Sequence, residues 1–197
     1  MNTACVIGNG TSRKTFDLEH IGNTMKTYGC NALYRDYIPD YLISMDWSIV
    51  EEILKNDIHH HTVFYTQDCA QFNSMPVERK ENIHWLKNMA RRLDSGNSAL
   101  EVALSHEYET IYMIGFDYNT LPGVLPNVYH GTTNYAKNSC VPAADNMARE
   151  WQQRLRNLIK AHPDTNVVRV NGSNISVNLD ATNYSEITTE QFKEIYE

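Results

Sequence analysis

Short apolar segments alternate with amphipathic ones along the whole chain, and this alternation limits the fold more than any other feature. Extended apolar segments lie at residues 4–8, 25–31, 41–46, 62–66, 110–117 and 166–170. Apolar residues recur at helical spacing between them, most plainly at 47–55, 95–108 and 143–161. Strands that alternate with helices form parallel sheets joined by helical crossovers. We therefore expect an α/β fold, an open and mostly parallel sheet with helices on both faces.

The chain of 197 residues is long enough for one core of ordinary size. We expect a single domain over residues 1–172, followed by a polar C-terminal tail at 173–197 with a short helix at 188–196. Two long segments, 67–83 and 118–142, show no periodicity, and loops of this length are often lids or binding loops.

The charge balance excludes one class of partner. The chain has 17 Lys and Arg against 24 Asp and Glu, a net charge of −7. A broad nucleic-acid surface needs clustered basic residues, so we expect no nucleic-acid partner, although a local basic pocket remains open. No apolar run reaches the roughly 20 residues that span a bilayer, and the N-terminus does not resemble a signal peptide. We expect a cytoplasmic protein without a membrane span.

The sequence also predicts no metal and no other cofactor. The four cysteines lie far apart without C-x-x-C spacing. His59, His60 and His61 are consecutive, and consecutive residues of a strand or helix cannot all converge on one ion. We interpret them as a solvated loop before a strand.

Ligands of open parallel sheets bind beyond the carboxyl ends of the strands, where the strand order reverses. Small and polar residues follow three of the expected strands: Gly8, Asn9, Gly10, Thr11 and Ser12; then Asn31; then Gly115 and Asp117. Such residues suit the hydrogen-bonding edges of a nucleobase and a ribose. We expect Asn9, Asn31, Gly115 and Asp117 to converge in one cleft, together with Ser95 and Gly96.

Each of these residues also has a purely structural explanation. Gly8-Asn9-Gly10 lacks the third glycine of the dinucleotide motif and is a good turn on its own. Its position before Thr-Ser favours anion or nucleotide binding through backbone N–H groups. Ser12 equally fits a helix cap, and Asp117 equally fits a turn cap.

His130 lies in a long polar loop on the expected ligand side of the sheet. Histidine changes charge near neutral pH and is suited to proton transfer. We therefore consider two roles for His130 equally, a general base and an ordinary loop residue. Its neighbours Tyr129 and Tyr135 carry hydroxyls that would stabilise a departing phosphate.

Together these motifs resemble the bacterial lipooligosaccharide sialyltransferases and the wider Rossmann-like group that contains DUF115 (Maf-type, MptE-like) proteins. The matching stretches occur in the family's order over roughly residues 4–135: Val6 to Ser12, Tyr28 to Asn31, Ser95-Gly96, and Ile111 to Tyr118. The chain also resembles small uncharacterised phage proteins.

The resemblance implies a Rossmann-like nucleotide-binding domain that holds a CMP-sugar donor without a metal. Asn9 and Asn31 would contact the nucleotide, and His130 would be the catalytic base. The pocket would be lined by Ser95, Gly96, Gly115, Asp117 and Tyr118. The sequence departs from the family at Tyr118-Asn119, where the family has Phe-Tyr, and at Arg13, where it has a leucine-like residue.

We therefore expect a glycosyltransferase-like enzyme that binds a nucleotide-sugar donor and transfers the sugar to a glycan or other hydroxyl acceptor, with a homo-oligomer as an open possibility. One alternative is a non-catalytic nucleotide-binding or protein-interaction module on the same fold. A second is an MptE-like diphosphokinase, which would need Mg²⁺ and carboxylates such as Asp46 and Asp117.

Overall fold

The computed structural model describes residues 2–68, 71, 81–86, 94–118, 126–135, 144–173 and 175–197. Its strands are β1 (Thr3–Ile7), β2 (Lys26–Cys30), β3 (Tyr41–Ser44), β4 (Val63–Thr66), β5 (Ile83–Trp85), β6 (Thr110–Ile114), β7 (Asn166–Val170) and β8 (Tyr184–Ile187). Its α-helices are α1 (Leu18–Thr24), α2 (Trp47–Lys55), α4 (Ser95–Leu104), α5 (Ala144–Ala161) and α6 (Thr189–Tyr196). Three short 3₁₀ helices are η1 (Thr11–Thr15), η2 (Asn31–Arg35) and η3 (Ile58–His60).

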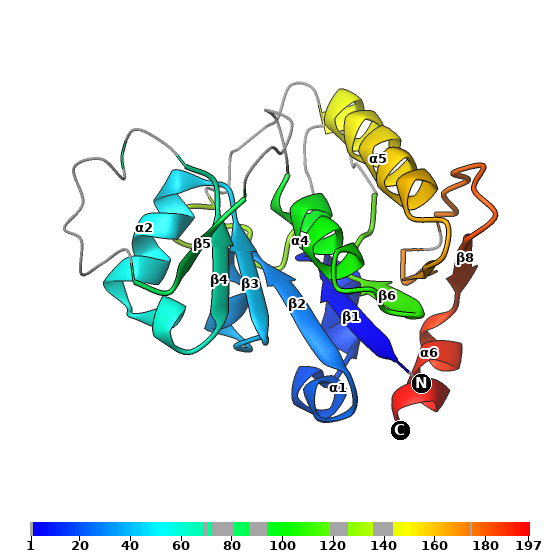
Figure 1. Ribbon diagram of the computed structural model, residues 1–197, viewed down its shortest axis with the longest axis horizontal. Coiled ribbons are helices and arrows are strands. Elements are labelled where there is room, and N and C mark those ends of the chain that lie inside the picture. Colours follow the sequence, from blue (N-terminus) through cyan, green and yellow to red (C-terminus); the bar gives the residue numbers. More distant parts are fainter. Residues whose placement is uncertain are drawn as a thin grey trace.

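The strands form one open sheet with the order β5-β4-β3-β2-β1-β6-β7-β8, and every described pair is parallel (Figure 1). This confirms the α/β, Rossmann-like fold that the alternation of strands and helices predicted. The chain builds the sheet outward from β1 to β5 and then returns to the other side of β1 with β6. The strand order therefore reverses between β1 and β6, which is where ligands bind in such sheets.

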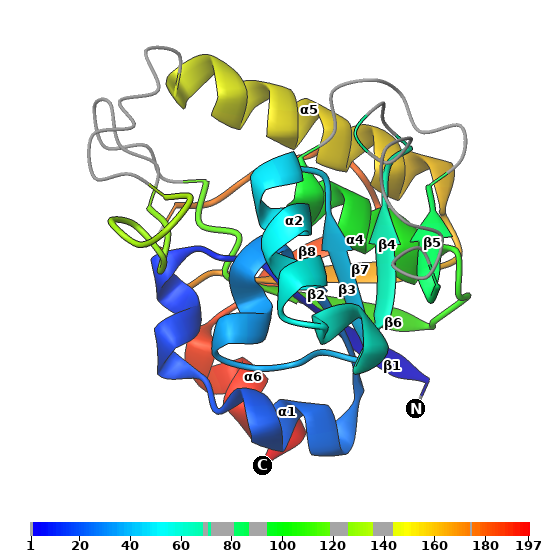
Figure 2. The same cartoon turned by 90° about the vertical axis from the view of Figure 1, so that its left-hand side faces the viewer.

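Helices cover both faces of the sheet (Figures 1 and 2). In β1, Ala4 and Val6 point to the core under α4 and α5, whereas Cys5 and Ile7 point to the core of α1 and α6. A third cluster packs α2 against β3 and β4. Because β1 is buried on both faces, its sequence is a continuous apolar run and does not alternate with polar residues.

Local capping sets the ends of α4. Its N-cap is Asp94, whose carboxylate accepts from the backbone N–H of Asn97 at 2.7 Å. The helix ends at Leu104, before the expected residue 108, and Glu107 just beyond it has a positive φ of 57°. The left-handed conformation is incompatible with a continuing right-handed helix.

The residues after 172 contribute a strand and a helix. β8 pairs with β7 at the sheet edge, and the expected short helix is present as α6. A capping box between Thr188 and Gln191 begins α6, which buries Phe192 against Phe16 in an edge-to-face contact at 5.6 Å. The edge strands β5 and β8 were not expected, and β5 begins at the end of the expected loop 67–83. Most of that loop and of 118–142 lies outside the described residues.

Candidate functional site

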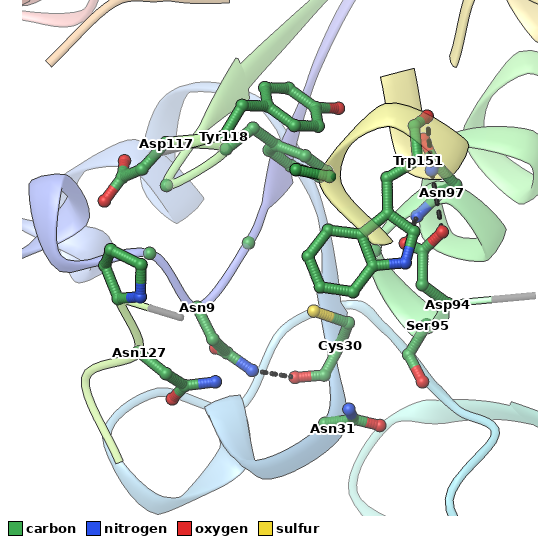
Figure 3. A pocket seen from close by; sticks show the side chains of 17 residues that line it. Asn9, Cys30, Asn31, Asp94, Ser95, Asn97, Asp117, Tyr118, Asn127 and Trp151 are labelled. Atoms are coloured by element: carbon green, nitrogen blue, oxygen red, sulfur yellow. Dashed lines mark hydrogen bonds between the residues drawn. The ribbon is translucent and has the colours of Figure 1, made fainter. Parts of the chain in front are cut away.

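A cleft opens at the carboxyl ends of β1, β2 and β6, beside the point where the strand order reverses (Figure 3). Its cavity encloses about 180 Å³. That is below the roughly 300–1,000 Å³ of pockets that enclose a drug-sized ligand, so a ligand of that size would extend from the cavity into the open side. The strand-end cleft is lined by Gly8, Asn9, Gly10, Cys30, Asn31, Asp94, Ser95, Gly96, Asn97, Gly115, Phe116, Asp117, Tyr118, Pro126, Asn127, Ala148 and Trp151.

Most residues that the sequence nominated for binding converge here, although they come from four separate parts of the chain. These are Gly8, Asn9, Gly10, Asn31, Ser95, Gly96, Gly115, Asp117 and Tyr118. Thr11 and Ser12 are not among the lining residues, and neither are Tyr129, His130 and Tyr135.

Asp117 accepts the hydrogen bonds of Thr11 and Ser12, the two nominated turn residues outside the cleft lining. Its carboxylate accepts from the Ser12 backbone N–H at 3.1 Å, from the Thr11 hydroxyl at 3.2 Å, and from the Ser12 hydroxyl. The donors expected at this turn for a phosphate therefore already serve a carboxylate of the protein. Asp117 ties the end of β6 to the start of η1.

The glycines of the turn allow two backbone segments to touch. Gly8 N–H donates to Ile114 O, and Gly10 N–H donates to Gly115 O, both at 2.8 Å. A Cβ on Gly8 or Gly10 would lie 2.5 Å from Gly115 O, closer than any side chain tolerates. Gly115 itself has a φ of 70°, which favours glycine. These glycines hold the β1 and β6 turns together.

The two asparagines expected to contact the nucleotide differ in how many of their hydrogen bonds are used. Asn31 Nδ2 donates to Asp46, and its Oδ1 accepts from Ser44. Asn9 Nδ2 donates to Cys30 O at 3.0 Å, whereas the buried Asn9 Oδ1 has no partner among the described residues. Because Cys30 O can only accept, the orientation of the amide is fixed, and the acceptor of this cleft-lining residue is unused by the described part of the chain.

Cys30 supplies no nucleophile. Burial raises the pKa of its thiol to about 12, so the thiol is protonated at neutral pH. Its Sγ lies 3.7 Å from Ile7 O, which fits the sequence interpretation of a small buried apolar residue.

Several cleft residues on or next to α4 and α5 were not nominated from the sequence. Asp94 and Asn97 flank the expected Ser95-Gly96, and Trp151 lies on α5. Ser95 Oγ accepts from Met45 N–H at 3.0 Å, which joins the start of α4 to the end of β3. The sequence indication for Asp94 was its N-cap position, whereas nothing in the pattern of α5 distinguished Trp151 from a core residue.

Tyr129 and Tyr135 point away from the cleft lining into the cluster of α2. Tyr129 hydroxyl donates to Asp36 at 2.9 Å and accepts from Arg13 Nη2 at 2.6 Å. Burial raises the pKa of both phenols, so both remain neutral. Neither tyrosine is among the described lining residues of the cleft, and their role in stabilising a departing phosphate stays a prediction.

His130 is exposed on the turn after β6, one residue beyond the buried Tyr129. Its backbone N–H donates to Asn127 O at 3.1 Å, and Val128 N–H donates to Asn9 O at 2.9 Å. The segment 126–135 therefore begins at the cleft, but the His130 side chain is not part of the lining. Its role as a base stays a prediction.

A charged network fixes the rest of this segment to α2. Arg35 forms a two-pronged pair with Glu52, at 2.7 Å and 2.6 Å, and also donates to Thr132 and to Thr133 O. Burial alone would raise the pKa of Glu52, but the hydrogen bonds from Arg35 and Tyr34 outweigh it and hold the pKa below its usual value. The network positions segment 126–135 beside the cleft.

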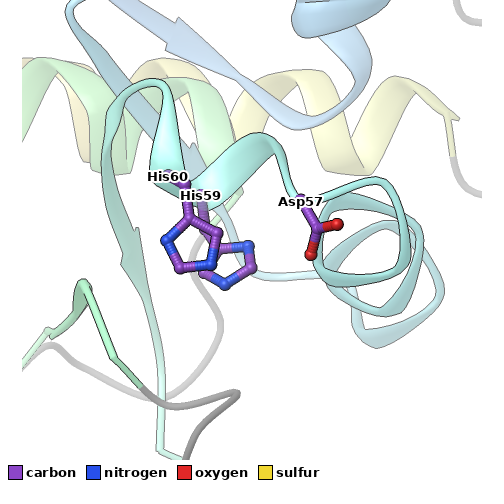
Figure 4. Close-up of side chains that lie close together, drawn as sticks. All are labelled: Asp57, His59 and His60. Carbon is purple, nitrogen blue, oxygen red and sulfur yellow. The ribbon is translucent and has the colours of Figure 1, made fainter.

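The structure corrects the interpretation of the consecutive histidines as a solvated loop at His59 alone, since His60 and His61 are exposed. His59 is 1% exposed, and its ring lies 4.0 Å from that of His60 (Figure 4). Asp57, His59 and His60 bring one potential ligand atom each within 4.8 Å of one another. His60 Nδ1 is in hydrogen-bond contact with Asn82 Nδ2. The group lies at the amino end of β4, opposite to the strand-end cleft.

No protein-family model matches the chain, and no curated protein matches it in sequence. Every helix in the described ranges is too short or too polar to cross a membrane. Among solved structures, the fold is similar to that of the sialyltransferase CstII from Campylobacter jejuni, determined with the substrate analogue CMP-3FNeuAc. The match has a TM-score of 0.52 at 14% identity and covers 99% of this chain and 98% of that chain. The chain therefore has the sialyltransferase-like fold that its motifs predicted, over its full described length.

Proposed function

We propose that this protein is a glycosyltransferase that binds a nucleotide-activated sugar in the strand-end cleft and transfers the sugar to a hydroxyl acceptor. The observation that carries the proposal is the convergence of Asn9, Asn31, Ser95 and Asp117 from separate strand ends and a helix start in one cleft. The likeness of the whole fold to an enzyme solved with a CMP-sugar analogue supports the same function.

The charges of the cleft favour a donor with a single phosphate. Among its described lining residues, none is Lys or Arg, whereas Asp94 and Asp117 bring two carboxylates. A nucleoside diphosphate sugar carries two phosphate charges, and a CMP-sugar carries one. Since a phosphate charge without a countercharge is costly to desolvate, we propose a CMP-sugar as the donor rather than a UDP- or GDP-sugar.

The chemistry that we propose is a direct transfer. The acceptor oxygen forms a bond to the anomeric carbon of the sugar as the bond from that carbon to the phosphate oxygen breaks. The acceptor proton passes to the His130 imidazole, and the nucleotide leaves with the electron pair of the broken bond. His130 is proposed because segment 126–135 begins against Asn9. No step of this proposal requires a metal.

Two alternatives stay open, and one observation bears on the second. A non-catalytic module on this fold would bind a nucleotide without turnover. A diphosphokinase would need Asp46 and Asp117 to face one set of phosphates through Mg²⁺. In the structure, Asp117 lines the cleft but Asp46 does not, and the two carboxylates bind different partners.

The proposal predicts release of CMP from a CMP-sugar by the purified chain, with much slower release from UDP- and GDP-sugars. Nucleotide release is measured for the three donors with and without Mg²⁺ and with simple glycans as acceptors. Nucleotide binding without release from any donor would support the module, and release that depends on Mg²⁺ and a second nucleotide would support the diphosphokinase.

Other predictions from the sequence belong to the same proposal. The identity of the acceptor, the homo-oligomer, the cytoplasmic location and the kinship with DUF115 and phage proteins stay predictions.

A further inference from the structure

Asn97 lines the strand-end cleft and carries a buried acceptor without a described partner. Its Nδ2 donates to Asp94 Oδ2 at 2.7 Å and to the backbone oxygen of Trp151 at 3.1 Å. A carboxylate and a carbonyl can only accept, so these two bonds fix which end of the amide carries the nitrogen. Asn97 Oδ1 is left without a partner in the described part of the chain, although the residue is only 1% exposed. An unpaired buried acceptor is costly unless a ligand donates to it.

Aromatic rings flank the same end of the cleft. Trp151 reaches it from α5, and Figure 3 shows its indole beside Asn97, among the lining side chains. Phe116 and Tyr118 line the cleft from the end of β6, with ring centroids 6.3 Å apart. Stacking on an aromatic side chain is a general means of binding a nucleobase. The free acceptor and the rings therefore occur together at the end of the cleft formed by α4 and α5.

We propose that Trp151 and Asn97 form the nucleobase subsite of the donor, Trp151 by stacking on the base and Asn97 Oδ1 by accepting from an exocyclic amine. The inference rests on the proposed function and adds to it the residues that select the base. Among pyrimidines, cytosine offers an amine donor at the position where uracil offers a carbonyl acceptor. Asn97 Oδ1 therefore binds cytosine and repels uracil.

The test compares the affinities of CMP and UMP by calorimetry for the wild type, Asn97→Ala, and Asn157→Ala, an exposed asparagine on α5 outside the cleft lining. We expect the wild type and Asn157→Ala to prefer CMP by about 10- to 100-fold, the factor for one unpaired polar group. Asn97→Ala should weaken the binding of CMP and leave the binding of UMP nearly unchanged. The ratio of the two affinities should therefore fall close to one. If Asn97 has only a structural role, Asn97→Ala will lower the affinities for CMP and UMP equally. That result would overturn the assignment of Asn97 to the nucleobase subsite.

Trp151 is tested by a second pair of variants. Trp151→Ala should lower the affinities for CMP and UMP alike by about tenfold or more, because stacking does not depend on the hydrogen-bonding edge of the base. Trp151→Phe keeps an aromatic ring and should retain most of the affinity for both nucleotides. Quenching of tryptophan fluorescence by CMP should be present in the wild type and lost in Trp151→Phe. Unchanged affinity in Trp151→Ala would overturn the stacking role.

The outcomes separate this inference from the proposed function. If the wild type binds neither CMP nor UMP, the proposed function and the subsite both fail. If the wild type binds CMP and UMP with equal affinity, or if Asn97→Ala keeps the preference, the subsite assignment fails and the proposed function stands.

Discussion

Replacing Arg169 by methionine is expected to lower the free energy of unfolding by about 3–5 kcal/mol, the usual cost of removing one partner of a buried ion pair. Arg169 is fully buried in β7 and pairs with Glu186 at 2.6 Å. Its guanidinium also donates to the backbone oxygens of Phe116, Asp117 and Ile175. The variant removes the countercharge of Glu186 and one donor from each of the three carbonyl oxygens, and methionine replaces none of these interactions.

The effect should depend on pH. Burial alone would raise the pKa of Glu186, but hydrogen bonds from Val177 N–H and Arg169, with others, hold the pKa below its usual value. A folded-state pKa below the unfolded one contributes stability above the unfolded pKa of about 4.3, and this contribution is lost as the pH falls through the folded pKa. The difference in the free energy of unfolding between the wild type and Arg169→Met should therefore be largest at neutral pH and should decrease at acidic pH.

Urea unfolding of the wild type and Arg169→Met at several pH values measures the difference in their free energies of unfolding. Arg156→Met is the matched control, because Arg156 makes a single described hydrogen bond, to Leu179 O, and should cost about 1 kcal/mol. An Arg169→Met variant as stable as the control would contradict the central role of this residue. Where Arg169→Met does not fold, Arg169→Lys should be intermediate, since it keeps the charge and loses the planar donors.

His130→Ala is expected to lower nucleotide release from the CMP-sugar by ~10²–10⁴-fold, the usual range for losing a general base. The affinity for CMP should change little, because His130 is exposed and lies outside the described lining of the cleft. The reason for the large kinetic effect is chemical: without the imidazole, the proton of the acceptor hydroxyl has no base to receive it.

The control for His130 is His61→Ala, which replaces an exposed histidine beside η3 at the opposite end of the sheet. Release rates and CMP affinity are measured for the three proteins across pH 5.5–8.5, about one and a half units on each side of neutrality. Equal release rates for wild type and His130→Ala, with CMP bound by both, would remove His130 from the mechanism.

Long, strongly apolar strands were predictable from sequence, and short edge strands were not. β1 and β6 are buried on both faces, so their apolar runs are visible in the sequence. β5 has three residues, and β8 is the polar segment YSEI at the sheet edge. Their pairing depends on the neighbouring strand more than on their own composition.

The same distinction holds for the cleft. Gly8, Asn9, Asn31 and Asp117 could be nominated because strand ends of a parallel sheet meet at one edge. Trp151 could not, because only the packing of α5 against α4 brings it to the cleft. The orientation of Tyr129 was also beyond the sequence, since it depends on Arg13 and Asp36, which are distant along the chain.

The central claim is that the strand-end cleft binds the nucleotide of the donor, and calorimetry of CMP with the wild type and Asn9→Ala tests it most directly. Asn9 Oδ1 is a buried acceptor without a described partner, so a bound nucleotide should donate to it. We predict saturable CMP binding by the wild type and by the Asn157→Ala control, and a loss of about 1–3 kcal/mol in Asn9→Ala. Absence of CMP binding by the wild type, or equal affinity in Asn9→Ala, would contradict the account.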